Sequence, residues 1–299
     1  MSVKDKTVSV ILPTRDRAPW LQKTIRSIVA QSHKPFEIIV IDDGSRDNTQ
    51  AILATECANA APQVFHFLQT TGLGVSAARN LGIRMARGAF IALIDSDDQW
   101  HPLKLEKQIA CLENHPDAAL CHTEEIWIRN GKRVNACKHH EKSGGWIFEK
   151  CLPRCVISPS ASLIRSSIFS EVGMFDETLP VCEDYDLWLR ICSRFAVAFV
   201  AEALTIKNGG HPDQLSHAYP MMDQYRISAL EKILHGKTLT PAQIILVHNM
   251  IAEKSKIIAT GARKRGNLEL AKQYERGRSL GPVTLTWHPE VPGQSDRAK

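Results

Sequence analysis

Two aspartates that stand two positions apart, Asp95 and Asp97, directly follow the apolar run Phe90–Ile94. In an extended chain, residues i and i+2 project to the same side, so both carboxylates can contact one ligand. Hard divalent cations such as Mg²⁺ and Mn²⁺ take oxygen ligands and commonly bridge to substrate phosphates. The pair is therefore a candidate site for a cation, and a solvated acidic turn is the alternative interpretation.

A second acidic turn, Asp42-Asp43-Gly44-Ser45, follows the apolar run Ile38–Ile41. Gly44 permits a tight turn with positive φ, and Asp is a common turn residue beside it. A carboxylate at the end of this strand could accept a hydrogen bond from a nucleobase N–H. The alternative interpretation is an ordinary turn between a strand and a helix.

Strand and helix patterns alternate over the first 100 residues. Short apolar runs predict strands, and apolar residues at helical spacing predict helices, the first with Pro19 in its first turn. The predicted strands are 8–12 (ended by Pro13), 38–41, 64–68 and 90–94, and the later helices include 75–85 and 102–114. Alternating βα units with fully apolar strands predict an α/β fold, with a mostly parallel sheet and helices on both faces.

Ligands of such sheets bind at the carboxyl ends of the strands. The turn Pro13–Arg17 and both acidic turns directly follow predicted strands. We therefore expect all three turns to meet at one crevice, which favours a functional interpretation of each.

The rest of the chain has two kinds of sequence pattern, first irregular segments mixed with strands and a helix, and then a series of helices. Residues 122–160 are irregular, 162–164, 196–200 and 204–206 are expected strands, and 184–192 is an expected helix. Three amphipathic helices are predicted at 221–236, 241–260 and 267–278. We therefore divide the chain into a main body at 1–220, a helical segment at 221–280 and a flexible tail at 281–299.

The net charge of +5 is unevenly distributed. Residues 226–278 hold 11 Lys or Arg against 4 Asp or Glu, whereas residues 1–225 hold 24 basic and 26 acidic side chains. The basic helices are either a solvated appendage packed on the main body or a patch for an anionic membrane surface. Only Tyr274 lies among these charges, so no nucleic-acid partner is expected.

The composition excludes several classes of protein. With 43% hydrophobic residues among 299, the chain can bury a core, which excludes disorder for most of it. Its apolar runs are far shorter than the roughly 20 residues that span a bilayer, and Met1–Thr7 lacks the apolar core of a secretory signal. We expect a cytoplasmic protein, with peripheral attachment to the inner face of the plasma membrane as a further option.

Eight cysteines in a chain without a secretory signal are expected to be reduced thiols. No pair of them has the CxxC spacing. A zinc site is the less favoured alternative, because the candidate ligands match no common spacing. Those candidates are Cys137, His139, His140, Cys151 and Cys155.

Together these motifs resemble glycosyltransferase family 2, whose fold is the nucleotide-sugar-binding GT-A type. Order and spacing agree over about residues 7–212, some two-thirds of the chain, and the C-terminal helices fall outside the resemblance. The matching segments are 8–17, 38–45 with Asp47, 74–80 with Gly82, Gly88, 91–98 with Trp100, Pro102 and Leu105, 172–177 and 183–190.

The resemblance implies a donor-binding role for two groups of residues. Thr14, Arg17 and Asp43 resemble the nucleoside-binding set. Asp95 and Asp97 resemble the pair that binds ribose and a Mn²⁺ or Mg²⁺ ion around the diphosphate.

Three further residues are implied to lie around the diphosphate. Arg79 and Asn80 would support the nucleotide pocket, and a purely structural role is equally open for both. His211 stands where many relatives carry a His that reaches the diphosphate or the metal, and an incidental loop His is the alternative.

Asp184 resembles the general base that removes the proton from the acceptor hydroxyl. Glu183 and Asp186 are its rivals, because all three acids stand together in one short segment. The alternative interpretation for the rivals is that acidic side chains are favoured in the first turn of a helix in any case.

The resemblance implies a metal-dependent, inverting glycosyltransferase. It would move a sugar from a UDP-, GDP- or dTDP-sugar to a hydroxyl of a glycan or lipid-linked acceptor, in cell-surface polysaccharide synthesis. One alternative is a non-catalytic nucleotide-sugar or glycan-binding module on the same fold. A sugar-phosphate nucleotidyltransferase is less favoured, because Leu12-Pro13-Thr14-Arg15 has no glycine where those enzymes carry a Gly-rich loop.

Overall fold

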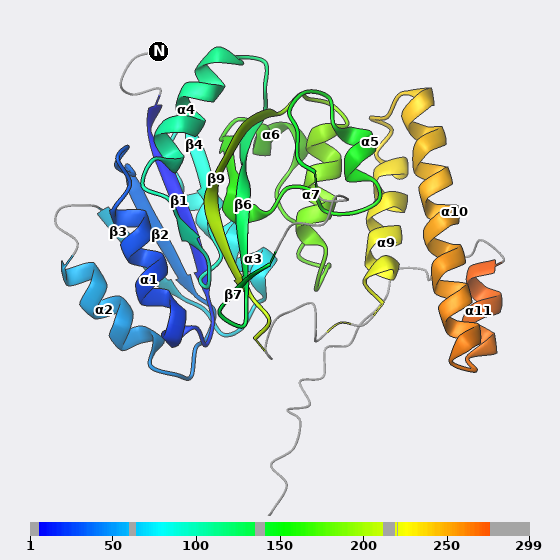
Figure 1. Ribbon diagram of the computed structural model, residues 1–299, viewed down its shortest axis with the longest axis horizontal. Coiled ribbons are helices and arrows are strands. Elements are labelled where there is room, and N and C mark those ends of the chain that lie inside the picture. The colour runs from blue at the N-terminus through cyan, green and yellow to red at the C-terminus, as the bar shows by residue number, and fades with distance from the viewer. Residues whose placement is uncertain (1–5, 60–63, 135–140, 212–218, 220, 276–299) are drawn as a thin grey trace, which may run out of the picture.

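The computed structural model describes residues 6–59, 64–134, 141–211, 219 and 221–275. In these ranges a nine-stranded sheet has the strand order β3-β2-β1-β4-β8-β6-β9-β5, with β7 paired to β6 (Figure 1). The strands are β1 (Val8–Thr14), β2 (Glu37–Asp42), β3 (Val64–Gln69), β4 (Phe90–Leu93), β5 (Gln99–Trp100), β6 (Leu120–Arg129), β7 (Lys132–Val134), β8 (Ser162–Arg165) and β9 (Ala198–Gly209). The helices are α1 (Ala18–Val29), α2 (Thr49–Asn59), α3 (Val75–Met85), α4 (Lys104–Asn114), α5 (Phe148–Cys151), α6 (Ile168–Val172), α7 (Glu183–Cys192), α9 (Met222–His235), α10 (Pro241–Lys264) and α11 (Leu268–Glu275).

The strands β1 to β4 form a parallel half of the sheet. The pairs β1–β2, β2–β3 and β1–β4 all run parallel. Every residue of β1, β2 and β4 is buried, as expected for strands that are covered by helices on both faces. The predicted alternation of strands and helices over this part of the chain is confirmed.

The strand β1 continues through Pro13 to Thr14, although the sequence predicts that Pro13 ends it. The Ile94 N–H donates to the Ile11 carbonyl, so Ile11 and Pro13 both face the β4 side. The pairing with β4 ends at Ile11 and Leu93. The missing N–H of Pro13 therefore costs no ladder hydrogen bond, and the extension brings Thr14 opposite Asp42.

The other half of the sheet is mixed, in contrast to the mostly parallel sheet that the sequence predicts. The strand β8 runs antiparallel to β4 and β6, whereas β6 and β9 run parallel. A single strand, β9, replaces two predicted ones, and register shifts opposite Thr123–Glu125 accommodate its extra residues. Such bulges redirect the side chains beyond them.

Two hydrophobic layers flank the sheet because successive strand side chains point to opposite faces. One layer packs β1, β2 and β4 against α1, α2 and α4, and the other packs the same strands against α3 and α7. Side chains of α9 belong to the same core as those of α7, among them Tyr225, Leu230 and Ile233.

The three C-terminal helices lie at one end of the molecule (Figure 1). They run close to their predicted ranges, although α10 is longer than predicted and extends to Lys264. The predicted tail at 281–299 lies outside the described residues. None of the helices in the described ranges has the length and apolar character needed to cross a bilayer.

Candidate active site

The turn that holds Asp95 and Asp97 follows β4 directly and is fixed from two sides. The Asp95 N–H donates to Ser160 Oγ at 3.0 Å. The single hydroxyl proton of Thr24 in α1 is shared between the carbonyls of Ser96 and Asp98, with oxygen–oxygen distances of 3.0 and 2.8 Å. These bonds fix the backbone of the turn that carries both aspartates.

Arg79 of α3 joins this turn to the start of α7. Its guanidinium is buried and donates to Asp95 Oδ1 at 2.7 Å and to Glu183 Oε1 at 2.6 Å. Burial alone would lower the pKa of Arg79, but the two carboxylates raise it above its usual value. Arg79 is therefore a permanent cation that connects segments about 100 positions apart.

The two carboxylates that share Arg79 differ in acidity. Burial would raise the pKa of Asp95, but the charges of Arg79 and Lys207 hold it below its usual value. Burial raises the pKa of Glu183 to about 7, and the adjacent Asp184 contributes in the same direction, against the effect of Arg79. Asp95 is thus the ionised partner at neutral pH, while Glu183 titrates near it.

Asp97 and His211, two members of the predicted cation set, contact each other. His211 Nε2 lies 2.9 Å from Asp97 Oδ2, and its ring contacts that of Trp20 in a tilted arrangement with centroids 5.1 Å apart. The Arg17 Nε atom approaches the same Asp97 oxygen at 3.9 Å. Burial and the charge of Asp95 raise the pKa of Asp97, which a bound cation would reverse.

The fit of a divalent cation follows from the chemistry of these donors. Among the described residues, no three His, Cys, Asp or Glu side chains form a closed ligand cluster. The site nevertheless concentrates hard oxygen donors, and the buried Oδ2 atom of Asp98 has no hydrogen-bond partner in the described chain. Burial raises the pKa of Asp98 well above its usual range. Three carboxylates in one turn, Asp95, Asp97 and Asp98, fit a divalent cation whose remaining ligands come from a diphosphate.

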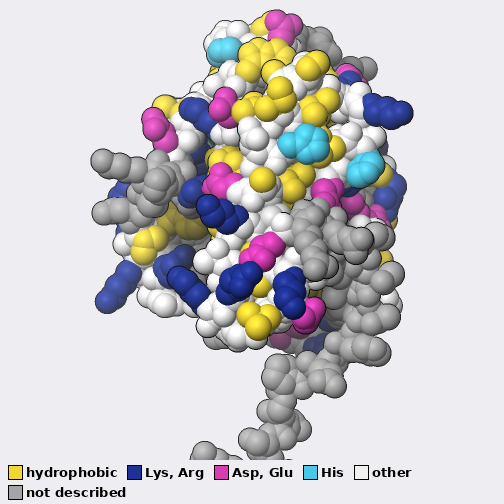
Figure 2. Space-filling model, turned by 90° about the vertical axis from the view of Figure 1, so that its right-hand side faces the viewer, with side chains coloured by type: hydrophobic (Ala, Val, Ile, Leu, Met, Phe, Trp, Pro, Cys, Tyr) yellow, Lys and Arg dark blue, Asp and Glu magenta, His cyan; other side chains and the backbone are white. Residues whose placement is uncertain are grey.

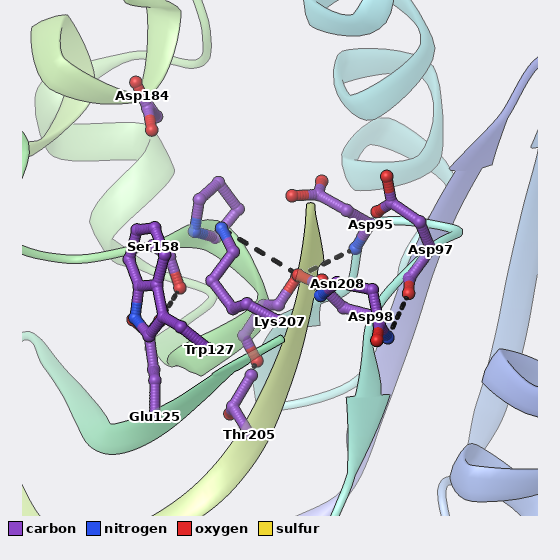
Figure 3. A network of polar contacts seen from close by, with 12 residues as sticks. Asp95, Asp97, Asp98, Glu125, Trp127, Ser158, Asp184, Thr205, Lys207 and Asn208 are labelled. Carbon is purple, nitrogen blue, oxygen red and sulfur yellow. Dashed lines mark hydrogen bonds and ion pairs between the residues drawn. The ribbon is translucent and has the colours of Figure 1, made fainter. Parts of the chain in front are cut away.

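Lys207 of β9 is a further charged residue of the site, which the sequence interpretation missed. Its Nζ atom lies 3.9 Å from Asp98 Oδ2 and 5.8 Å from the centroid of the Trp127 ring (Figure 3). Burial alone would lower the pKa of Lys207, but Asp98, Glu125 and Asp95 raise it above its usual value. The β6–β9 bulges place it there, and no periodicity in the sequence predicts them.

Glu125 and its hydrogen-bond partners lie beside Lys207. Glu125 accepts hydrogen bonds from Lys142 Nζ at 3.0 Å, from Trp127 Nε1 at 3.1 Å and from the Ser158 hydroxyl. Burial would raise the pKa of Glu125, but Lys142 and Lys207 hold it below its usual value. The sequence interpretation also missed this buried carboxylate, since its segment carries no motif.

Thr14 and Asp43, two residues of the predicted nucleoside-binding set, lie at adjacent strand ends. The Asp43 N–H donates to the Thr14 carbonyl at 2.8 Å. The Asp43 carboxylate accepts from the N–H groups of Leu73 and Gly74 at 2.7 and 2.8 Å, and from the Thr70 hydroxyl. Both of its oxygens therefore shape the loop before α3. The buried Thr14 hydroxyl has no partner among the described residues.

Asn80 makes three hydrogen bonds that fit a purely structural role, the alternative to support of the nucleotide pocket. Its amide pairs with both the N–H and the carbonyl of Phe175, each at 2.9 Å, and donates to Glu177 at 2.8 Å. These bonds anchor the loop between α6 and α7 to α3. Its neighbour Arg79 differs, because it contacts Asp95 directly.

Asp184 stands in the first turn of α7, across the view of Figure 3 from Asp95 and Asp97. Its Oδ1 atom accepts from the Tyr185 N–H at 2.7 Å, and its Oδ2 atom lies 3.2 Å from Cys155 Sγ. Neither partner is a cation, and among the described residues Asp184 forms no ion pair.

The rivals of Asp184 are both engaged in ion pairs. Asp186 is buried and binds Arg190 at 2.7 Å and Lys232 at 3.1 Å. Glu183 is bound to Arg79. Of the three acids, Asp184 is the one whose surroundings best suit a general base, because a base must be able to accept a proton from substrate.

The basic C-terminal helices use much of their charge internally. Lys232, Lys254 and Arg226 pair with acids of the main body or of α9, and Arg263 and Lys272 pair with Glu275 and Glu269 of α11. Figure 2, which faces these helices, shows acidic and basic side chains interspersed over the lower half and hydrophobic side chains gathered over the upper half. This arrangement favours the packed-appendage alternative over a continuous basic patch.

The zinc alternative finds no support in the described part of the chain. Cys151 and Cys155 are free thiols there, and no metal-binding group of three includes them. Cys137, His139 and His140 lie outside the described residues.

Comparisons with known proteins agree on one family. Residues 9–173 match the family described as Glycosyl transferase family 2. An uncharacterized glycosyltransferase of Rickettsia conorii is 31% identical over 68% of this chain, which spans only 33% of that relative's length. An uncharacterized glycosyltransferase of Rickettsia typhi is 29% identical over 88% of this chain and 81% of its own length.

Two solved structures share the fold. Staphylococcus aureus TarS 1–349 in complex with UDP-GlcNAc has a TM-score of 0.63 at 15% identity, covering 91% of this chain and 92% of TarS 1–349. A mannosyltransferase from Pyrobaculum calidifontis in complex with GDP-Man and Mn²⁺ has a TM-score of 0.62 at 17% identity, covering 90% of this chain and 79% of its own. These neighbours are GT-A type glycosyltransferases, so the predicted fold class is confirmed.

Proposed function

The chain belongs to glycosyl transferase family 2, and from this premise we propose that it transfers a sugar from a nucleoside-diphosphate donor to a hydroxyl of a glycan or lipid-linked acceptor. The observation that carries the proposal is the Arg79 bridge, which unites the Asp95 turn and the first turn of α7 in one site. UDP-GlcNAc and GDP-Man, bound by the structural neighbours, support a UDP-, GDP- or dTDP-sugar as donor. A role in cell-surface polysaccharide synthesis is part of this proposal.

In the proposed reaction, Asp184 accepts the proton of the acceptor hydroxyl. The acceptor oxygen then forms a bond to C1 of the donor sugar on the face opposite the diphosphate. The bond between C1 and the diphosphate oxygen breaks, and the electron pair leaves with the diphosphate. This single displacement inverts the configuration at C1.

The donor would lie along the carboxyl ends of β1, β2 and β4. Thr14, Arg17 and Asp43 would face the nucleoside, and Asp95 the ribose. Asp97, with Asp95 and His211, would hold a Mn²⁺ or Mg²⁺ ion. When bound, this ion would stabilise the negative charge on the leaving diphosphate. The hydrogen bond from Arg79 to Asp95 Oδ1, at 2.7 Å, fixes the orientation of this carboxylate.

Peripheral attachment to an anionic membrane remains a prediction for residues 226–278. Ion pairs within the C-terminal helices reduce the positive charge available to an anionic membrane. Salt screens the attraction between exposed charges, so the result depends on the salt concentration. A vesicle sedimentation assay at about 0.1 M salt tests it. Equal recovery with neutral and anionic vesicles would exclude the attachment.

A thermal-shift panel tests donor binding. The probes are UDP-GlcNAc, UDP-glucose, GDP-mannose and dTDP-glucose, each with and without Mn²⁺. A ligand at 100 times its Kd stabilises the folded state by about 2.7 kcal/mol, which raises the melting temperature measurably. We expect one nucleotide class to respond, and more strongly with Mn²⁺. No response to any probe with Mn²⁺ present would contradict the proposal, and binding without turnover would favour a non-catalytic module.

The base is tested with a matched pair of variants. Asp184→Asn is expected to lower kcat by about 10²- to 10⁴-fold, since general-base catalysis contributes that much. Asp186→Asn, two positions along the same helix, is expected to lower the melting temperature and to reduce kcat less than tenfold, because its partners are Arg190 and Lys232. The reverse pattern would show that Asp186, not Asp184, is the base.

A further inference from the structure

Cys155 provides a hydrogen-bond donor to the proposed base. Its Sγ atom lies 3.2 Å from Asp184 Oδ2 and 3.0 Å from the Ile157 carbonyl oxygen. Burial and the charge of Asp184 raise the pKa of Cys155 well above its usual range, so the thiol keeps its proton. Of the two acceptors the carboxylate is the stronger, because it is charged. With the Tyr185 N–H on Oδ1, both carboxylate oxygens then have a donor.

Two buried side chains hold the segment that leads into Cys155. The Tyr185 hydroxyl donates to the Leu152 carbonyl at 2.6 Å. The Lys254 ammonium donates to the Pro153 carbonyl at 2.8 Å and to Asp223 Oδ1 at 3.1 Å. Only 5% of the Lys254 side chain is exposed. Because it comes from α10, a helix 101 positions further along the chain fixes this short segment.

The same C-terminal helices also hold the element that carries Asp184. Lys232 of α9 binds Asp186 at 3.1 Å and Asp176 at 2.6 Å. Core side chains of α9 belong to the same hydrophobic cluster as Trp188 of α7. The helical segment therefore contacts both sides of the Cys155–Asp184 hydrogen bond.

We propose that Cys155 and Lys254 are positioning residues for Asp184, Cys155 by direct hydrogen bonding and Lys254 through the Pro153 carbonyl. This inference rests on the proposed function, in which Asp184 is the base. It gives the packed C-terminal helices a role in positioning the base. Among the described residues, Cys155 and Lys254 form no hydrogen bond with the proposed donor-binding residues at the ends of β1, β2 and β4, so we expect the two roles to separate in kinetics.

The kinetic test compares five proteins with the donor that responds in the thermal-shift panel. Cys155→Ala and Lys254→Met are expected to lower kcat about five- to tenfold, with the donor KM within about twofold of wild type, since each loses one hydrogen bond near the base. Cys155→Ser retains a donor and is expected to restore kcat to within about threefold. Lys256→Met is the matched control, because Lys256 is exposed on the same helix, and its kcat is expected to be unchanged.

An unchanged kcat in Cys155→Ala would overturn the inference, and so would a loss that appears in the donor KM alone. Failure of Cys155→Ser to recover more than Cys155→Ala would also overturn it, because the size of the side chain would then matter instead of its proton. Absence of turnover in the wild-type protein would be a failure of the proposed function, and is distinguishable from each of these results.

A labelling experiment tests the Lys254 contact without any turnover. Iodoacetamide labelling of the folded protein is followed by mass spectrometry, with the partly exposed Cys57 of α2 as internal reference. Lys254→Met is expected to accelerate the labelling of Cys155 relative to Cys57 by about fivefold or more, because the Pro153 carbonyl loses its donor and the segment opens more often. An unchanged ratio would show that Lys254 does not hold this segment.

Discussion

Replacement of Arg79 by Met provides a direct test of the charge arrangement that unites the site. The variant removes a guanidinium that is 4% exposed and leaves Asp95 and Glu183 without their shared partner. The side chains of these two acids are 28% and 9% exposed, so both must either remain ionised in a poorly solvated place or bind a proton. Breaking a buried ion pair from one side costs about 3–5 kcal/mol.

This cost corresponds to a fall in melting temperature of about 6–20 °C, at about 2–4 °C per kcal/mol for a chain of this size. The deficit should depend on pH. Without Arg79, the folded-state pKa values of both acids lie above their unfolded values, so the folded variant gains stability as the pH falls and the acids bind protons. We therefore expect a larger deficit at pH 8 than at pH 6 in thermal unfolding followed by circular dichroism.

Two further variants make the experiment decisive. Glu183→Gln in the Arg79→Met background removes one of the two acids that lose their partner, and is expected to make the protein more stable at pH 8 and less dependent on pH than Arg79→Met alone. Arg84→Met on the same helix removes an arginine that is 50% exposed, with its Glu177 partner 3.9 Å away, and is expected to cost less than about 0.5 kcal/mol. Equal stability of wild type and Arg79→Met at pH 8 would refute this reasoning, as would a double variant no more stable than the single one.

Three other predictions concern stability. Burial lowers the pKa of Lys104 to about 7. Between about pH 7 and 10.5 the unfolded chain therefore binds one more proton at Lys104 than the folded protein, and wild-type stability should rise with pH. Urea unfolding should show a gain of about 2 kcal/mol from about pH 7.5 to about pH 9.5 that Lys104→Met lacks, and equal pH dependence in the two proteins would contradict this. A Cβ at Gly82 would lie 2.6 Å from Ile11 Cγ2 and 2.9 Å from Ile41 Cδ1, so Gly82→Ala should cost about 1–3 kcal/mol in the same assay, and a neutral result would mean that α3 can shift away from the sheet. Thr240 and Gln243 form a capping box at the start of α10, so Thr240→Ala should cost about 1 kcal/mol, whereas no loss would mean that the helix end frays in the native protein.

The parallel half of the sheet and its turns were accessible to prediction from local patterns. A strand that is buried on both faces is apolar at every position, which is why the runs ending at Asp42 and Asp95 indicate strands without any knowledge of their neighbours. The acidic turns follow these runs, and parallel strands bring their carboxyl ends to the same edge. The positions of Asp43, Asp95 and Asp97 therefore follow from the order of elements alone.

The mixed half of the sheet was not accessible in the same way. An apolar run records that a strand is buried but not which strand pairs with it or in which direction. The bulges between β6 and β9 aim Lys207 toward Asp98, and they leave no periodic signal in the sequence. Lys207, the lysine beside Asp98, was missed for this reason.

Residue types and their order determined the family, the nucleotide-binding half of the fold and the short list of acids that can do chemistry, because these depend on local periodicity and on motifs read along the chain. Tertiary structure alone decided which of those acids are paired. Arg79 meets Glu183 across 104 positions, Lys254 reaches Pro153 across 101 positions, and Asp186 is bound by a lysine 46 positions away. The charge and proton affinity of a side chain depend on its distance to other charges and on its exposure to water, and folding sets both for residues far apart in the sequence.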